Sequence, residues 1–546
     1  MKKAVIKELR EALMAQETTK DQATGKVTLA LSVSDKRHRA KTSFVRATSM
    51  DLAWKTVTEL LAPAPQESWV RVETINSLQR RPLVDLQQDL KVMTRMNFWR
   101  RGVSFDPEFK TALLEMEING HEFFHPGKDH QVGKNASDMW IDFKAIVDYL
   151  QERDGQVEPD LAASQYIWSF TTAGIFSDGQ QIWPLSTRED GTTGVRLLQN
   201  PKQEIQTYLT AGEDYLARQI DDDGKFVYGY FPAMQRVLTN YNSVRHFSSI
   251  YALMEAIAAT GSDDDITKAQ TALRWGIEHL TVVKNDACFA IEHPKNGTPE
   301  IKLGAQAMLI LALCKYQEVT KDSQFETVTR QAFRGVVAFR QPTGRFNHVL
   351  NPDLTVKDSF RIIYYEGEIA FALIRLFELT DDAEIGQQAQ QTLDFMVEND
   401  FGKYHDHWIA YASNEAVQAF PANRDYMAMG LQNAFSNLDF IEAQISPHPT
   451  RLELLNATVR LIDAIRRTDN EDLLEKYDVQ HLREVWQRRA EHELSTGAFE
   501  PEVAMFFYRP SKFYGGFFTR NDHFRTRIDD CEHFLSGLIN YYNYKY

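Results

Sequence analysis

Cysteine is scarce in this chain of 546 residues, and no stretch of it is apolar for long. The three cysteines (Cys288, Cys314 and Cys531) are far apart and form no CxxC pair, so they predict neither a disulfide framework nor a cysteine zinc site. The longest purely apolar run, 307–314, is far shorter than the ~20 residues that span a bilayer. The charged N-terminus also lacks the apolar stretch of a signal peptide. We therefore expect a cytoplasmic protein without membrane insertion.

Basic residues are outnumbered by acidic ones. The sequence has 61 basic and 76 acidic residues and a formal net charge of −15, whereas a protein that neutralises nucleic-acid phosphates needs a basic surface. The patterns GxxxxGK[ST], GxGxxG and GxSxG are missing, so nucleotide-dependent phosphoryl transfer and serine hydrolase chemistry have no support. We expect no nucleic-acid partner and no cofactor, and the sequence leaves the oligomeric state open.

The first 195 residues show mixed α+β character. Alternating apolar residues predict strands, longer periodic segments predict helices, and Ser177-Asp-Gly predicts the turn of a hairpin. The turn-rich segment 186–193 is the predicted linker to the rest of the chain. The predicted strands are 27–33, 42–48 and 69–75, the helices are 50–61, 83–93, 107–118 and 140–153, and the hairpin spans 167–185.

A period of 60 residues organises the chain beyond this domain. Ala252, Ala312 and Ala372 are 60 apart, and Thr260, Thr320 and Thr380, which close three apolar helices, keep the same spacing. Each apolar helix is followed by an acidic turn and an amphipathic helix, so the pattern indicates a repeated helical hairpin. An inner ring of apolar helices wrapped by amphipathic ones explains the difference between the two helices.

The count of about twelve helices predicts six hairpins. The last helix ends in apolar and aromatic residues, which suits closure on the first hairpin better than the polar cap of an open solenoid. The predicted fold class is therefore mainly α, with an (α/α)6 toroid at 196–546 preceded by a smaller α+β domain at 1–195.

Ionisable residues gather at the heads of the predicted inner helices. Short segments of the form Gly-x-Phe (224–226, 344–346 and 497–499) precede those heads, so the loops should meet at one mouth of the toroid, where helix N-termini carry partial positive charge. The residues at this level are Arg245, His246, Tyr365, Glu366, Glu368, Arg424, Asp425, Arg527, Asp529, Asp530 and His533.

With this period and this polar mouth, residues ~200–546 resemble the six-hairpin, (α/α)6-toroid superfamily of carbohydrate-active enzymes. That superfamily includes unsaturated glucuronyl hydrolases, other inverting glycosidases, polysaccharide lyases and the N-acylglucosamine 2-epimerase group. The resemblance rests on the hairpin period, the Gly-x-Phe segments, and the groups Tyr241-Asn242-Arg245-His246, Tyr365-Glu366-Gly-Glu368 and Asp529-Asp530. It implies a sugar site lined by aromatics and carboxylates and a glycan or oligosaccharide substrate, and it identifies no single family.

Glycoside hydrolysis is the leading interpretation of the carboxylates. This reaction needs one protonated and one ionised carboxyl group, ~6.5–9.5 Å apart for inversion. Glu366 and Asp529 lie on different predicted helices and are the favoured pair, with Glu368, Asp425 and Asp530 in reserve. Arg245, His246 and Arg527 would bind hydroxyls or a uronate. Tyr228, Tyr230, Tyr241, Asn242, Tyr365 and Arg424 complete the predicted substrate wall.

Three alternatives remain open. A sugar epimerase or isomerase would use His246 and His533 as acid and base beside a carbonyl. A non-catalytic toroid would bind a polymer or a protein, with its acids acting only as first-turn partners of helix dipoles. A zinc peptidase would use His121-Glu122-Phe-Phe-His125, which fits HExxH, although the following Pro126 disfavours helix there. His405-Asp-His407 has metal-like spacing but is interpreted as an exposed turn.

Overall fold

A computed structural model describes residues 3–16, 20–93, 95–126, 139–155, 160–187, 194–196, 198–295 and 297–546. The chain divides into two compact units. Unit 1 comprises 1–199, 230–237 and 495–526, and unit 2 comprises 200–229, 238–494 and 527–546. The first division falls close to the predicted boundary, and unit 1 also takes two later segments that the sequence-based division assigns to the toroid. Residues 188–193 of the predicted linker lie outside the described part of the chain.

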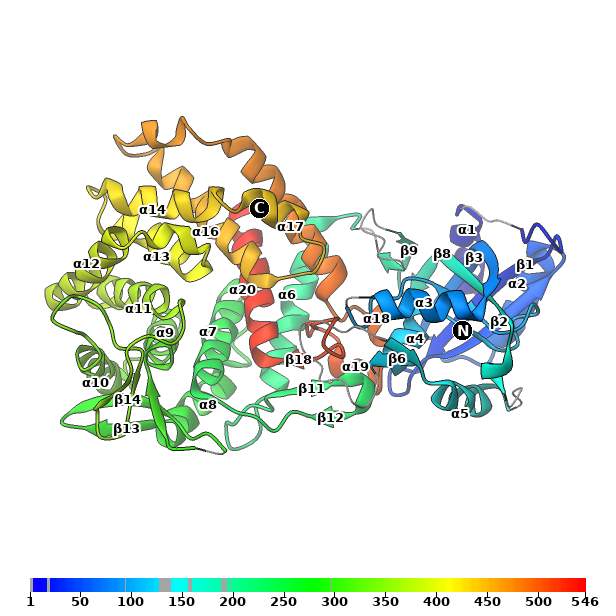
Figure 1. Cartoon of the computed structure of the whole chain (residues 1–546), viewed down its shortest axis with the longest axis horizontal. Helices are drawn as coiled ribbons and strands as arrows, with labels where there is room; N and C mark the ends of the chain where they lie inside the picture. Colours follow the sequence, from blue (N-terminus) through cyan, green and yellow to red (C-terminus); the bar gives the residue numbers. More distant parts are fainter. Residues whose placement is uncertain are drawn as a thin grey trace. The chain divides into compact units, whose positions relative to one another are not determined.

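Unit 1 is built on an antiparallel sheet whose strands follow the order β10-β9-β8-β3-β1-β2, with β4 paired to β8 and β5 to β4 (Figure 1). The predicted hairpin is present as β8 and β9, and the predicted helix 50–61 is α2, capped by Ser49. The strands are β1 (Val27–Ser34), β2 (Lys41–Ala47), β3 (Trp69–Pro82), β4 (Gly102–Ser104), β5 (Ala112–Leu113), β8 (Tyr166–Ser177), β9 (Ile182–Ser186) and β10 (Val195–Arg196).

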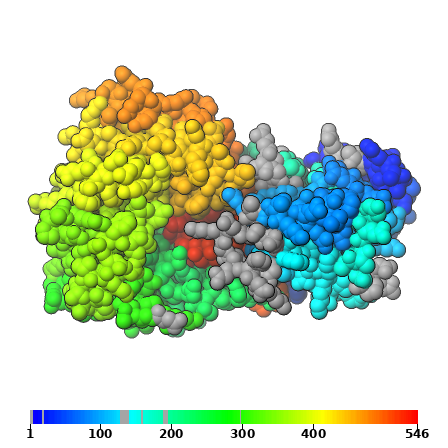
Figure 2. Space-filling model, in the orientation of Figure 1, coloured from blue at the N-terminus to red at the C-terminus, as the bar shows by residue number. Residues whose placement is uncertain are grey.

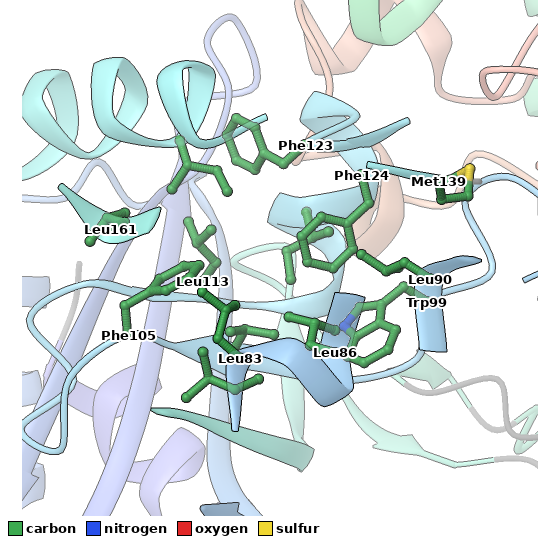
Figure 3. Close-up of a cluster of buried hydrophobic side chains, with 14 of the residues drawn as sticks. Leu83, Leu86, Leu90, Trp99, Phe105, Leu113, Phe123, Phe124, Met139 and Leu161 are labelled. Carbon is green, nitrogen blue, oxygen red and sulfur yellow. The ribbon is translucent and has the colours of Figure 1, made fainter. Parts of the chain in front are cut away.

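Helices cover this sheet and enclose two apolar cores. α1 (Lys3–Met14) and α2 (Met50–Leu61) pack on strands of the sheet and bury one cluster that includes Leu9 and Val57. Figure 3 shows the second cluster, in which Leu86 and Trp99 meet Phe124 and Met139. Its neighbouring elements are α3 (Leu83–Val92), α4 (Glu115–His121), β6 (Phe124–Pro126), β7 (Met139–Ile141) and α5 (Phe143–Asp154). The later segments of unit 1 hold α18 (Pro501–Ala504), α19 (Pro510–Phe513) and β12 (Arg236–Val237).

Six apolar helices of unit 2 contact one another in a closed circuit. α7 contacts α9, α9 contacts α11, and the series continues through α13, α16 and α20 back to α7 (Figure 1). Figure 2 shows the surface of unit 2. Red atoms of the C-terminal segment lie there between green atoms and yellow-to-orange atoms from earlier parts of the chain. These inner helices are α7 (Ser243–Thr260), α9 (Leu303–Thr320), α11 (Tyr365–Thr380), α13 (His407–Ala419), α16 (Pro449–Ile465) and α20 (Ile528–Lys545).

Amphipathic helices lie outside this circuit, and several contact the inner helix that precedes or follows them. α9 is buried from Leu303 to Cys314, whereas α10 buries one face only, which is the contrast that the sequence predicts. The outer elements are α6 (Pro201–Arg218), α8 (Ile266–His279), α10 (Glu326–Val337), α12 (Ala383–Glu398), α14 (Arg424–Phe435), α15 (Leu438–Ala443) and α17 (Val479–Gly497).

The period of 60 residues has a structural basis in how three inner helices end. α7, α9 and α11 end at Thr260, Thr320 and Thr380, and each threonine hydroxyl donates to the carbonyl four residues earlier. The next residue in each case, Gly261, Lys321 or Asp381, adopts the left-handed conformation that terminates a helix. The repeat is therefore a repeated C-terminal cap together with a repeated apolar face.

A small sheet joins consecutive hairpins of unit 2. Its strands run in the order β13-β14-β15-β16-β17, and β15 leads directly into α9. Gly224 and Gly344 occupy tight turns at φ +99° and +85°, which explains the predicted Gly-x-Phe segments at these two places. The strands are β13 (Thr281–Lys284), β14 (Ala287–Glu292), β15 (Glu300–Lys302), β16 (Val349–Leu350) and β17 (Val356–Asp358); β11 (Gly229–Phe231) and β18 (Thr526–Arg527) lie at unit boundaries.

Two predictions of local structure are wrong. The predicted helix 107–118 is instead a turn, the short strand β5 and the start of α4, because Asp106 binds the backbone and hydroxyl of Thr111 and closes the turn. Asp406 and His407, interpreted as part of an exposed turn, are instead buried, and they cap and begin the inner helix α13 (His407–Ala419). None of the helices in the described residues is both long and apolar enough to cross a membrane.

Close packing between inner helices predicts different outcomes for two glycines. A Cβ on Gly367 of α11 would lie 2.9 Å from Trp408 Cβ and 3.0 Å from the Ile409 nitrogen of α13, whereas on Gly537 of α20 its nearest neighbour is a Leu452 methyl at 3.4 Å. We expect Gly367→Ala to lower the free energy of unfolding by ~1–3 kcal/mol, and Gly537→Ala to raise it by up to ~1 kcal/mol. Urea unfolding of both variants measures this, and equal effects would contradict the packing.

Candidate functional site

Polar side chains of unit 2 gather at the N-terminal ends of its inner helices. Glu366 and Glu368 stand in the first turn of α11, Asp406 caps α13 and His407 begins it. On the remaining helices the polar side chains are Arg245 and His246 on α7, Glu453 on α16, and Asp529, Glu532 and His533 on α20. Ionisable groups therefore gather at the N-terminal ends of the inner helices. A second set, which includes Lys315, Arg375 and Glu415, lies farther along these helices.

Two histidines meet at the centre of this group. The rings of His407 and His533 lie edge to face, with centroids 5.2 Å apart. His533 Nδ1 lies 2.9 Å from Glu453 Oε2, and its Nε2 lies 3.1 Å from Glu532 Oε1. His407 Nε2 lies 4.0 Å from the same Glu453 oxygen and makes no hydrogen bond. A buried nitrogen without a partner is costly, so it is a natural position for a ligand or substrate atom.

The two histidines are held in opposite protonation states. Burial by itself lowers the pKa of His533, but the carboxylates of Glu453 and Glu532 outweigh burial and raise this pKa to about 10. Burial, with the positive charge of His533 nearby, lowers the pKa of His407 to about 3. His533 is therefore cationic and His407 neutral across the physiological range. The His533 side chain keeps 21% exposure, so a molecule at the site can reach it.

Three acids in the same region have strongly raised pKa values. Burial and the charge of Asp406 raise the pKa of Glu368 to about 8, and burial raises those of Asp406 and Glu532 to about 7 and 8. One oxygen of Glu368 and one of Asp406 are buried without a hydrogen bond. Asp406 Oδ1 accepts the Trp408 backbone N–H and lies 3.2 Å from His407 Nδ1. Asp406 therefore also orients His407.

Glu366, the favoured acid of the sequence analysis, is held by a buried histidine. His348 Nε2 lies 2.9 Å from Glu366 Oε1, while His348 Nδ1 accepts the backbone N–H of Arg361 at 2.9 Å. Since Nδ1 accepts, the ring proton of a neutral His348 is on Nε2 and points at Glu366. The Tyr365 ring packs beside His348, and burial raises the tyrosine pKa. Glu366 is thus anchored to the loop between α10 and β16.

Asp529, the predicted partner of Glu366, belongs to a separate cluster of paired charges. Its carboxylate lies 2.6 Å from Arg245 Nε and 3.0 Å from Arg527 Nε. Arg527 also pairs with Asp530 at 3.1 Å. Arg245 in addition donates to the hydroxyl of Tyr228. The structure therefore brings these five predicted residues together, with each acid facing an arginine.

His246 and its neighbours have structural partners. Its Nδ1 lies 2.8 Å from the Tyr241 hydroxyl and its Nε2 lies 3.0 Å from the Ala272 carbonyl, so both ring nitrogens are occupied within the fold. Burial lowers the pKa of His246 to about 3 and raises that of Tyr241. Asn242 caps α7 by accepting the Arg245 N–H. The predicted histidine pair of His246 and His533 is thus replaced in space by His407 and His533.

Three other predicted residues lie away from this group. Arg424 and Asp425 begin α14, one loop beyond the C-terminal end of α13. His407 begins α13, so the helix of 13 residues separates them from it by roughly 20 Å. Arg424 pairs with Asp472 on the surface. Tyr230 belongs to unit 1, where Lys512 lies 3.9 Å from the centre of its ring.

The HExxH match does not form a zinc-binding helix. α4 ends at His121, Glu122 adopts φ +58°, and His125 lies in β6. Glu122 accepts a hydrogen bond from His523, and His125 Nδ1 bonds to the Pro126 carbonyl. The two histidines are therefore not one helical turn apart, which removes the geometry on which a zinc peptidase depends. The structural reason is the chain reversal at Glu122 before Pro126.

Four residues of the site were not predicted from the sequence: Asp406, His407, Glu453 and Glu532. Asp406 and His407 belong to the HDH segment, and an N-capping Asp directly before an apolar helix is a signal that could have found them. Glu532 adjoins the predicted His533. Glu453 gives no sequence signal, because an acid inside the first turns of a helix is an ordinary partner of the dipole.

The same residues have the spacing of a metal site. In the described part of the chain, one group of potential ligands is found, His407, Glu453 and His533, whose ligand atoms all lie within 4.8 Å of one another. Metal ligation requires neutral imidazoles. The raised pKa of His533, and the two carboxylates that its nitrogens face, mean that a metal would compete with a tightly held proton.

No family model matches the chain, and no curated protein sequence matches it either. Solved structures similar to it include a cellobiose 2-epimerase from Bacillus thermoamylovorans, with 13% identity over 63% of this chain and 99% of that one and a TM-score of 0.46. A D-mannose isomerase has 11% identity over 53% and 86%, with a TM-score of 0.43. An α-1,6-mannanase from Salegentibacter sp. has 11% identity over 62% and 98%, with a TM-score of 0.44.

These similar structures are carbohydrate-active enzymes of the kinds that the sequence resemblance names, and they include an epimerase, an isomerase and a hydrolase. No specific family is identified among them. These similarities assign no reaction to this chain.

The buried acid Glu368 predicts a stability effect that depends on pH. Its pKa is raised to about 8 in the folded protein, whereas an exposed glutamate has 4.5. The folded state therefore binds more protons, and this residue destabilises the fold progressively as pH rises from about 4.5 to 8. We expect Glu368→Gln to raise the melting temperature over wild type at pH 8.5 and to change it little at pH 4.5.

The matched control for that variant is Glu278→Gln, on the exposed face of α8, which should change the melting temperature little at either pH. A Glu368→Gln effect that is independent of pH would contradict the raised pKa.

Proposed function

We propose that unit 2 is an (α/α)6 toroid and that it catalyses the epimerisation or isomerisation of a sugar with a free reducing end. The observation that carries this proposal is the pair His407 and His533, in contact and in opposite protonation states. Two titratable groups whose pKa values are pushed apart supply an acid and a base at one pH. The contact circuit of the six inner helices supports the toroid.

The base is His407. Asp406 Oδ1 lies 3.2 Å from its Nδ1, so an ionised Asp406 keeps the ring proton on Nδ1 and leaves a lone pair on Nε2. That nitrogen is buried and makes no hydrogen bond in the fold. It removes the proton at C2 of the open-chain sugar, and the C–H electron pair forms the C1=C2 bond of an enediol.

The acid is His533. It is an imidazolium whose Nδ1 is held by Glu453 and whose Nε2 lies 3.1 Å from Glu532. Nε2 donates its proton to the carbonyl oxygen on which charge develops, while Glu453 keeps the ring in place. For the ketose, His407 returns its proton to C1 while the O2–H proton passes to His533 and the C2=O bond forms. For the epimer, the enediol turns its opposite face toward His407, which returns the proton to C2 while the O1–H proton passes back to His533 and the aldehyde re-forms. Both histidines end in their starting protonation states, so atoms and charge balance.

Aromatic side chains provide a wall for the sugar. Tyr364 stands 45% exposed, with its ring centroid 6.2 Å from that of His407, and Trp408 packs on both His407 and His533. Such rings match the apolar faces of a pyranose. The cluster of Arg245, Tyr228 and Asp529 offers hydrogen bonds to hydroxyl groups on the side of α20.

Proton exchange at C2 tests the proposal directly. We expect the protein in D2O to incorporate deuterium at C2 of a reducing mono- or disaccharide, observed by NMR together with the new epimer or ketose. His407→Asn and His533→Asn should each lower the rate ~10²–10⁴-fold. His279→Asn, an exposed histidine of α8, is the matched control and should retain the rate. Unchanged rates in both site variants would contradict the proposal.

Glycoside hydrolysis is the second candidate, and Glu368 favours it. A carboxyl group with a pKa of about 8 is protonated at neutral pH and can serve as the general acid for a leaving-group oxygen. Asp529, the predicted second carboxylate, would have to act while paired with Arg245 and Arg527. New reducing ends from a glycan, abolished by Glu368→Gln and retained in His407→Asn, would support hydrolysis over isomerisation.

Asp406 is proposed as a positioning residue, and its replacement has a distinctive signature. Asp406→Asn keeps an oxygen that caps α13 and faces His407 Nδ1, but it removes the negative charge that favours the ring proton on Nδ1. We expect kcat to fall ~10²–10⁴-fold with little change in KM. The pH profile of kcat should lose the rise near pH 7 that ionisation of Asp406 gives in wild type. A rise near pH 7 that persists in the variant would contradict this role.

A further inference from the structure

Unit 1 contains a cavity that the proposed reaction does not use. It measures about 570 Å³ and lies where the loop before β1 meets β3 and β8. Cavities of this size hold small molecules. The lining side chains include Lys20, Asp21 and Thr24 from the loop, Arg46 from β2, Ser77 and Arg80 from β3, and Trp168 from β8.

The cavity is positively charged in a chain whose net charge is −15. Four of its lining residues are basic and one is acidic. Arg46 and Lys26 are neutralised by Asp21 and Glu108, at 2.6 and 2.9 Å. Lys20 and Arg80 have no carboxylate partner among the described residues. Two cations that face a cavity without a counterion favour an anionic ligand.

The position of Arg80 is fixed by its neighbours. Its guanidinium lies 3.7 Å from the centre of the Tyr166 ring, and its Cα is paired with that of Trp168 across β3 and β8. Stacking on an aromatic ring holds the planar guanidinium while leaving its edge N–H groups available. Half-buried Trp168 adds a flat apolar surface beside this charge.

The backbone of β3 is irregular at the same place. The pairing of β3 with β8 shifts register between Asn76 and Gln79, and Ser77 adopts φ +47°. Bulges of this kind occur next to binding sites, where they redirect side chains, and a serine in this conformation carries strain. Arg46 Nε is buried in the cavity wall without a hydrogen bond, with Glu108 Oε2 3.6 Å away. The backbone irregularity therefore lies beside the charged lining residues.

We infer that this cavity is a second binding site, for an anionic sugar. The ring of the sugar would lie on Trp168, its carboxylate or phosphate would bind Arg80 and Lys20, and Ser77 and Thr24 would meet its hydroxyl groups. A ligand at this site binds independently of the histidine pair in unit 2, and the inference goes beyond the proposed reaction.

Calorimetric titration with four compounds tests the inference: glucuronic acid, glucose 6-phosphate, glucose and inorganic phosphate. We expect one or both anionic sugars to bind at least 10-fold more tightly than glucose and than phosphate alone. Whichever of the two binds identifies the anionic group. Arg80→Ala and Trp168→Ala should each weaken that binding at least 10-fold, whereas Lys41→Ala, an exposed lysine of β2, should not.

The histidine variants separate this inference from the proposed reaction. His407→Asn should leave the titration unchanged while it lowers deuterium exchange, and Arg80→Ala should do the reverse. Equal binding of glucose and the acidic sugars, tight binding of phosphate alone, or binding that survives both Arg80→Ala and Trp168→Ala would overturn the inference.

Discussion

The ion pair between Glu453 and His533 is the interaction on which the site of unit 2 depends. It joins α16 to α20 near the N-terminal ends of these two inner helices, and Glu532 contacts the other nitrogen of the same ring. A buried carboxylate is costly unless it is paired, and His533 supplies the compensating charge. The positive charge on His533 then helps to keep His407 neutral. The ion pair thereby sets the charge of His533 and adds to the burial that keeps His407 neutral.

The other acids of the site are subject to the same cost of burying an unpaired charge. Acids at helix N-termini are stabilised by backbone N–H groups, yet those in the interior of unit 2 exceed the cations available to pair with them. Glu366 pairs with His348 through one oxygen, and Asp529 pairs with two arginines. Glu368, Asp406 and Glu532 instead have raised pKa values and hold protons near neutrality. The site therefore combines anchored charges at its edge with protonated or unpartnered groups near its histidines, a combination suited to proton transfer.

Periodic features of the fold were predictable from the sequence, and three-dimensional pairings were not. The spacing of Thr260, Thr320 and Thr380 reflects a C-terminal helix cap that is repeated in three hairpins. Because this cap is local, its spacing can be recognised in the sequence. The polar mouth was predicted from the same register, and Glu368, Arg245, Asp529 and His533 lie there. The register fails after Thr380. The residue 60 positions beyond Glu366 is Tyr426, which lies in the outer helix α14 and not in an inner helix, so Arg424 was placed wrongly. His407 was missed because its partner Glu453 is 46 residues away, and only folding brings them together.

The central claim is that His407 and His533 sit in contact with widely separated pKa values. An NMR titration of ¹⁵N-labelled imidazoles, assigned with His407→Asn and His533→Asn, measures both directly. The account predicts that His533 stays protonated at pH 8 and that His407 stays neutral at pH 5, in line with pKa values of about 10 and about 3. Two histidines that both titrate near pH 6.5 would contradict it.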